Sequence, residues 1–286
     1  MPPMDFFHRA ANQWLVSLVA GTALTKVAMF FIAWAILWLP LALIVATLVK
    51  WHPPQPLAGE QKLPLLASLY LIAPLIVWGV TRVEGTSFSE YGVEWNLSLL
   101  VSLGWGLTLG ILSLAIAFAA ESALGWVVWH WQNWRQLVQA CLPILLLGLW
   151  IGFTEELVFR GFLVTQLQVD YSIWVTGAIS SAVFALLHLI WEQKDTLPQL
   201  PGLWIMGVVL VLARWVDGGS LGLAIGLHAG WICGLTCLDS VQLISYTGKG
   251  PIWITGLGNN PLAGLIGFFC LLGVGSVLLV MSPYSL

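Results

Sequence analysis

Apolar stretches of about 20 residues recur along the chain, and short segments rich in Pro, Gly or polar residues separate them. A helix needs about 20 mostly apolar residues to cross the hydrocarbon core of a bilayer. The pattern therefore predicts eight transmembrane helices, near residues 27–49, 64–82, 97–119, 137–163, 172–191, 202–217, 220–238 and 262–281. The fourth continues in helical pattern to about Gln168, which is longer than a bilayer requires. We expect an all-α integral membrane protein with one helical bundle.

The segment before the first predicted span is only moderately apolar. Asp5 stands where a signal peptide would carry basic residues, and a full span follows at once, so a cleaved leader is not the better interpretation. We expect residues 1–26 to form a lead-in helix at the membrane interface. Residues 27–286 contain no linker long enough to separate domains and are predicted to form one polytopic membrane domain.

Composition excludes a soluble protein. Only 8% of the 286 residues are charged and 59% are hydrophobic, whereas soluble domains are about 25% charged. The net charge is −3, from 10 Lys and Arg against 13 Asp and Glu, and basic residues do not cluster. Because nucleic-acid binding depends on a basic surface, nucleic-acid partners are excluded. The lipid bilayer is the expected surrounding of a multi-pass chain.

A few ionisable residues fall inside the predicted spans. A charge at the centre of a bilayer costs about 2.5–3.5 kcal/mol, so each such residue needs a reason. The residues of this kind are Glu155, Glu156 and Arg160 in the fourth span, His188 in the fifth and His228 in the seventh. Clusters of this kind mark functional sites in membrane proteins.

Helix geometry predicts how these residues meet. If the fourth and fifth spans turn near Tyr171–Ser172, Glu155 and His188 both lie about 25 Å from the turn and face each other. Glu156 and Arg160 are four residues apart, which predicts an ion pair with a structural role. Glu155 has no cation at helical spacing in its own span. Its partner is therefore expected to be His188 or His228, and a nearby imidazole would poise Glu155 as a base for water.

These residues resemble the CPBP family, the CAAX protease and bacteriocin-processing or abortive-infection family of intramembrane glutamic endopeptidases. The first family motif, E-E-x-x-x-R, matches Glu155, Glu156 and Arg160. The second, F-x-x-x-H, matches Phe184 and His188, and His228 matches the histidine that begins the third. The resemblance covers residues 137–238. It implies that Glu155 and His188 activate water while His228 stabilises the oxyanion.

One position departs from the family pattern. Ile232 stands four residues after His228, where the family usually has Asn or Asp that helps to bind the oxyanion. Trp231 is on the same helical side as His228 and carries an indole N–H. It is a candidate replacement donor, and packing against a neighbouring helix is the alternative explanation for this residue.

Two groups of residues have side chains of types that bind metals. Glu155, His188 and His228 form a set of one carboxylate and two imidazoles that can hold catalytic zinc. The chain has no H-E-x-x-H motif and Glu156 is expected to bind Arg160, so we expect a reaction without metal or cofactor, with zinc as the alternative. Cys233 and Cys237 lie one helical turn apart, but two thiols without further ligands favour simple packing.

The sequence therefore predicts an intramembrane endopeptidase that cleaves a membrane-associated or lipidated peptide. A non-catalytic membrane scaffold or immunity partner, bound to another membrane protein, is the alternative that Ile232 favours. A proton-coupled transporter is a third hypothesis, because Glu155 and two histidines could relay protons. The sequence has neither an inverted repeat nor paired broken helices, which disfavours transport.

Overall fold

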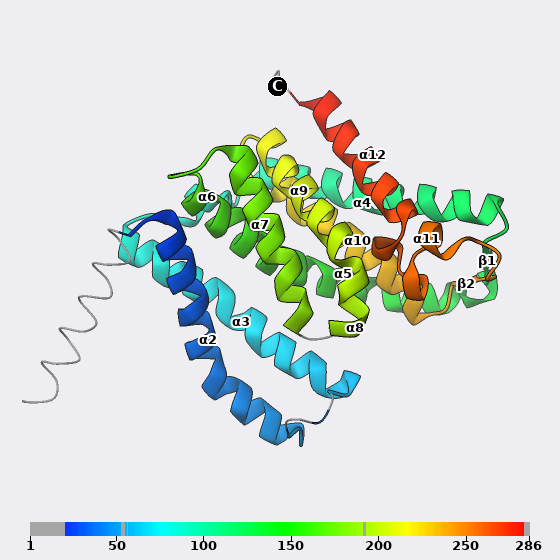
Figure 1. The fold of residues 1–286 in the computed structure, drawn as a ribbon, viewed down its shortest axis with the longest axis horizontal. Coiled ribbons are helices and arrows are strands. Elements are labelled where there is room, and N and C mark those ends of the chain that lie inside the picture. Colours follow the sequence, from blue (N-terminus) through cyan, green and yellow to red (C-terminus); the bar gives the residue numbers. More distant parts are fainter. Residues whose placement is uncertain (1–20, 53–54, 56, 191–192, 283–286) are drawn as a thin grey trace, which may run out of the picture. The chain divides into compact units, whose positions relative to one another are not determined.

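A computed structural model describes residues 21–52, 55, 57–190 and 193–282 (Figure 1). Within these residues the regular elements are helices except for two three-residue strands, as the apolar pattern predicts. Among the described residues, seven helices are long and apolar enough to span a membrane. They are Ala23–Leu48, Gly59–Glu84, Leu97–Ala123, Trp131–Leu167, Ile173–Ile190, Gln193–Val216 and Gly222–Ser240. The eighth predicted span corresponds to a shorter apolar helix, α12 (Leu265–Met281). The protein is therefore a multi-pass, all-α integral membrane protein.

The predicted lead-in helix, residues 1–26, lies outside the described residues up to position 20. The chain forms two compact units. The first contains the described part of Met1–Glu90 together with Thr165–Ser172. Its helices α2 (Ala23–Leu48) and α3 (Gly59–Glu84) pack against each other. Lys26 Nζ and Glu84 Oε1 form an ion pair of 2.9 Å between them.

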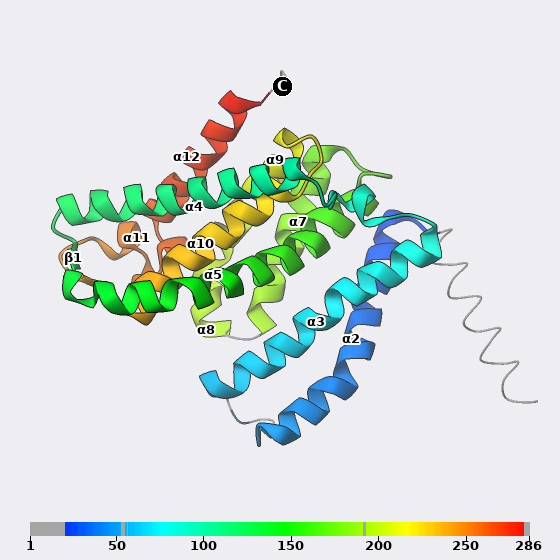
Figure 2. The same ribbon diagram turned by 180° about the vertical axis from the view of Figure 1, so that it is seen from behind.

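The second unit, Tyr91–Val164 with Ile173–Leu286, contains every residue of the candidate site. Its helix α10 (Gly222–Ser240) packs against α4 (Leu97–Ala123) and α5 (Trp134–Glu156), as Figure 2 shows. Two further helices, α7 (Ile173–Leu187) and α9 (Leu200–Val216), pack against each other, and α12 contacts α9 and α4. Strands β1 (Val127–Trp129) and β2 (Ile244–Tyr246) form an antiparallel pair that joins two connections.

Glycines allow α10 to approach its neighbours closely. A Cβ atom added at Gly110 of α4 would lie 2.8 Å from the Leu227 carbonyl oxygen, and one added at Gly230 of α10 would lie 2.7 Å from that of Leu107. Small residues spaced four apart let helix backbones touch in membranes. The helix that carries His228 is thereby held against α4.

The fourth span is continuous but not uniform. After α5 ends at Glu156, the chain makes a π-helical turn over Leu157–Leu163 and returns to α-helix in α6 (Val164–Leu167). The long helix predicted from the sequence is therefore confirmed, and the π-helical turn within it was not predicted. Such turns are rare and are frequent at functional sites. This one begins directly after Glu155 and Glu156.

Candidate active site

Three elements of the second unit bring the predicted residues together. Glu155 and Glu156 are the last two residues of α5, Arg160 lies in the π-helical turn, and His228 lies in the middle of α10. Glu156 and Arg160 are fully buried, and Glu155 and His228 are 6% and 3% exposed. These groups are therefore removed from solvent and act on one another.

The predicted ion pair between Glu156 and Arg160 is present. Arg160 Nη1 donates to Glu156 Oε1 at 3.0 Å, and the guanidinium lies 4.3 Å from the ring centroid of Phe184. Removing one partner of such a pair would leave an uncompensated buried charge. The pair and the aromatic ring together make a cation tolerable at this depth.

His228 connects the two glutamates. Its Nδ1 atom lies 2.7 Å from Glu156 Oε1, the oxygen that also binds Arg160, and its Nε2 atom lies 3.6 Å from Glu155 Oε2. A carboxylate that binds Arg160 accepts hydrogen bonds, so the Nδ1 atom of His228 carries a proton and donates a hydrogen bond to Glu156. The ring is thereby fixed with Nε2 directed toward Glu155. Glu156 thus has a second contact beyond the structural pair expected from its spacing.

His188 reaches this region through Phe184. The His188 Nδ1 atom and the Phe184 carbonyl oxygen are 2.8 Å apart, and the two rings have centroids 4.5 Å apart. The Phe184 ring is fully buried and also lies 6.0 Å from the His228 ring. Because a carbonyl only accepts, the Nδ1 atom of His188 carries a proton and donates a hydrogen bond to the Phe184 carbonyl oxygen. Direct assistance of Glu155 by His188 stays a prediction.

Arg214 is a contributor that the sequence did not single out. It lies in α9, is 8% exposed, and donates from Nη1 to the carbonyl oxygens of Arg160 and Gly161 and from Nε to that of Gly219 at 3.1 Å. A π-helical turn disturbs the regular backbone ladder, and its carbonyls need other donors. Arg214 supplies them. From the sequence, Arg214 lies near the end of the predicted span 202–217, where charged residues are common. Its burial in the structure is what indicates a structural role.

Trp231 and Ile232, three and four residues after His228, have different surroundings. Trp231 Nε1 donates to Ser113 Oγ of α4 at 3.1 Å, so its single N–H is already used and packing explains the residue. Ile232 lies beside α5, where a Cβ added at Gly148 would meet its Cγ2 atom at 3.5 Å. The replacement donor offered by the sequence is therefore occupied in this structure.

The alternative zinc set has suitable ligand types in Glu155 and His228. Yet among the described residues, the one group of three or more His, Cys, Asp or Glu ligand atoms that all lie within 4.8 Å of one another is formed by Cys141, Cys233 and Cys237. Zinc at Glu155, His188 and His228 remains the alternative prediction.

Comparison with known proteins adds one finding. The searches of curated proteins and of solved structures each found no match. Residues 137–233 match the model of a family described as type II CAAX prenyl endopeptidase Rce1-like. The matched segment contains the whole glutamate, arginine and histidine arrangement described above. The resemblance of this segment to the CPBP family, which its three motifs indicate, is thereby confirmed.

Proposed function

We propose that this chain is an intramembrane endopeptidase that hydrolyses a peptide bond of a membrane-associated or lipidated substrate. The family match supports a membrane protease role in general. The observation that carries the finer proposal is the placement of His228 between two carboxylates, with Nδ1 2.7 Å from Glu156 and Nε2 3.6 Å from Glu155. A base and an imidazole held side by side in a water-poor site suit the activation of a single water molecule.

In the proposed reaction, Glu155 is the general base and His188 assists it. Glu155 takes a proton from water, and the resulting hydroxide forms a bond to the carbonyl carbon of the substrate. His228, protonated on both nitrogens, donates from Nε2 to the developing oxyanion. Glu155 then returns its proton to the amine nitrogen as the carbon–nitrogen bond breaks. The catalytic residues are Glu155, His188 and His228.

Glu156 and Arg160 are positioning residues in this scheme. The Glu156 carboxylate fixes the imidazole orientation and stabilises its cationic form, as a buried carboxylate does for the histidine of serine proteases. Arg160 holds the Glu156 carboxylate in place through the 3.0 Å contact. The reaction needs no metal and no cofactor, and a zinc-dependent reaction is the alternative.

The burial of the site favours substrates that enter from the bilayer. The family description names prenyl CAAX endopeptidases, so peptides with a prenylated C-terminal cysteine are the first class to test. Acylated peptides and unmodified transmembrane peptides are the other classes. An adjoining membrane protein would be the partner if the chain were a scaffold without turnover, the alternative favoured by Ile232.

The test uses the full chain, purified in detergent and reconstituted in liposomes, against quenched fluorescent peptides of these three classes. Wild type is compared with Glu155→Gln, and Glu60→Gln serves as the matched control because Glu60 is exposed at the start of α3. Removing a general base typically costs about 10²–10⁴ in rate. We expect this loss for Glu155→Gln and none for Glu60→Gln.

Two results would contradict the proposal. Cleavage that survives Glu155→Gln unchanged would exclude Glu155 as the base, and absence of cleavage by wild type over all three classes would favour the scaffold. A chelator arm addresses the metal. Loss of activity on chelation that Zn²⁺ restores would replace the metal-free scheme by the zinc alternative.

A further inference from the structure

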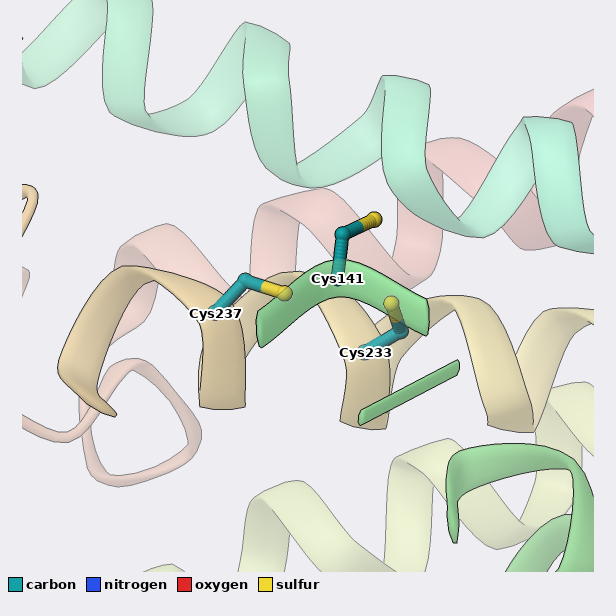
Figure 3. Close-up of side chains that lie close together, drawn as sticks. All are labelled: Cys141, Cys233 and Cys237. Carbon is teal, nitrogen blue, oxygen red and sulfur yellow. The ribbon is translucent and has the colours of Figure 1, made fainter. Parts of the chain in front are cut away.

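Three cysteines lie together on the helix pair that carries the candidate active site, between the first half of α5 and the second half of α10. Cys141 lies in the first half of α5, while Cys233 and Cys237 lie in the second half of α10. Figure 3 shows the three side chains on the two facing helices. Their sulfur atoms all lie within 4.8 Å of one another. The sequence paired only Cys233 with Cys237, and the fold adds Cys141 as a third thiol.

The helices approach closely enough for this because α5 has a glycine at the contact. A Cβ added at Gly148 would lie 3.1 Å from the Ala229 carbonyl oxygen and 3.6 Å from the Cys233 backbone nitrogen. Cys233 and Cys237 are 4% and 7% exposed, and Cys141 is exposed. The three-cysteine cluster therefore has two buried thiols and one exposed thiol.

The spacing of the sulfurs matches a metal with three ligands. With metal–sulfur bonds of about 2.3 Å, three thiolates around a planar three-coordinate ion lie about 4 Å apart. Small rotations of the cysteine side chains are enough to bring the sulfur atoms from within 4.8 Å of one another to this spacing. None of the four cysteines is in a disulfide, so all three sulfurs of the cluster are available as ligands.

The ligand set selects the ion. Soft thiolates favour Cu(I) and zinc over harder cations. Zinc in structural sites takes four ligands, usually with tetrahedral geometry, and the cluster found among the described residues offers three. We propose that Cys141, Cys233 and Cys237 bind one Cu(I) ion through three thiolates and so link α5 to α10. This site is independent of the proposed protease activity.

The location gives the ion a definite structural effect. Cys141 precedes Glu155 by 14 residues of the same helix, or about 21 Å. Cys233 follows His228 by five residues of α10, or about 7.5 Å, so the ion lies near the candidate active site without being in direct contact with the reacting groups. The ion links α5 to α10, the two helices that hold Glu155 and His228, and it should raise the thermal stability of the folded chain. Because each thiol loses a proton on binding, the affinity should fall as the pH is lowered.

The test titrates the purified full chain in detergent, without oxygen, with Cu(I) supplied as a coloured chelate. The expected result is transfer of one Cu(I) per chain, with thiolate-to-copper absorption and an X-ray absorption shell of three sulfurs. Cys141→Ser, Cys233→Ser and Cys237→Ser should each weaken binding by more than about tenfold, since even indirect ligand supports cost that much. Cys270→Ser is the matched control because Cys270 lies outside the cluster.

Cys141→Ser protects the test against misfolding, because its thiol is exposed and its replacement should leave the metal-free melting temperature unchanged. Failure of wild type to take up Cu(I), or equal uptake by wild type and the three cluster variants, would overturn the proposal. Stoichiometric uptake of Zn²⁺ in the absence of Cu(I) uptake would also overturn it.

Discussion

The Nδ1 atom of His228 lies 2.7 Å from Oε1 of Glu156, and the same oxygen accepts a hydrogen bond from Arg160 at 3.0 Å. One carboxylate oxygen thus ties a local ion pair to a histidine 72 residues further along the chain. Helical spacing explains the first contact, whereas only the packing of α10 against α5 explains the second. Glu156 therefore joins the stability of the helix to the orientation of the candidate catalytic ring.

Glu156→Gln should lower kcat of the proposed cleavage about 10- to 100-fold, the usual cost of losing a group that orients a functional side chain. KM should change little, because Glu156 does not touch substrate in the proposed scheme. Steady-state kinetics per folded molecule separates the two effects. Glu156→Asp keeps the charge and should recover part of the loss. A variant with normal kcat and reduced folded yield would limit Glu156 to a structural role.

Arg160→Met should destabilise the fold by about 3–5 kcal/mol, because it leaves the buried Glu156 carboxylate without its cation. The double variant Glu156→Gln/Arg160→Met removes both charges and should be more stable than Arg160→Met alone. Denaturation of the detergent-solubilised chain measures both. Arg135→Met is the control, since Arg135 is exposed. If the double variant were the less stable of the two, the ion-pair explanation would be wrong.

Arg214→Met should cost about 1–3 kcal/mol, since the carbonyls of the π-helical turn lose a buried donor. Arg214→Lys should recover only part of this, because an ammonium group lacks the planar fork that reaches Gly219 at the same time. The rate of peptide cleavage should fall in both variants, because the π-helical turn carries Arg160. Unchanged stability of Arg214→Met would show that water replaces the guanidinium at these carbonyls.

Gly106→Ala tests the close packing of α4 against α10. A Cβ there would meet the Leu223 carbonyl oxygen and would lie 2.8 Å from the Leu227 backbone nitrogen, so the helices must separate. Overpacking of this kind costs about 1–3 kcal/mol. Gly104 is the matched control, because a Cβ at this position of the same helix meets no atom within 4 Å. Gly104→Ala should be neutral or slightly stabilising. Equal effects of the two variants would contradict the close contact.

Apolar length and helical spacing were sufficient to predict most of the helices and the Glu156–Arg160 pair, but they left open whether His188 or His228 lies beside Glu155, and the structure places His228 Nε2 3.6 Å from Glu155 Oε2. The features that could be predicted depend on one helix alone. Arg214 and Cys141 could not be assigned in this way, because their roles depend on which helix faces lie together. The π-helical turn also escaped prediction, since it shifts the side-chain register without changing the apolar pattern.

The buried carboxylate of Glu121 leads to a final prediction. The side chain is 1% exposed, and neither carboxylate oxygen has a hydrogen-bond partner within the part of the chain that the structure describes. It borders a cavity of about 40 Å³ whose lining is apolar. Burial, and then the nearby Glu121, raise the pKa of the Tyr246 hydroxyl in β2, so this neighbour supplies no opposite charge.

Burying an unpaired charge is costly. Glu121→Gln should therefore raise the free energy of unfolding at pH 8 by about 1 kcal/mol or more, whereas Glu60→Gln at an exposed site should not change it. A loss of stability in Glu121→Gln would mean that the carboxylate binds a cation or an ordered water in this cavity.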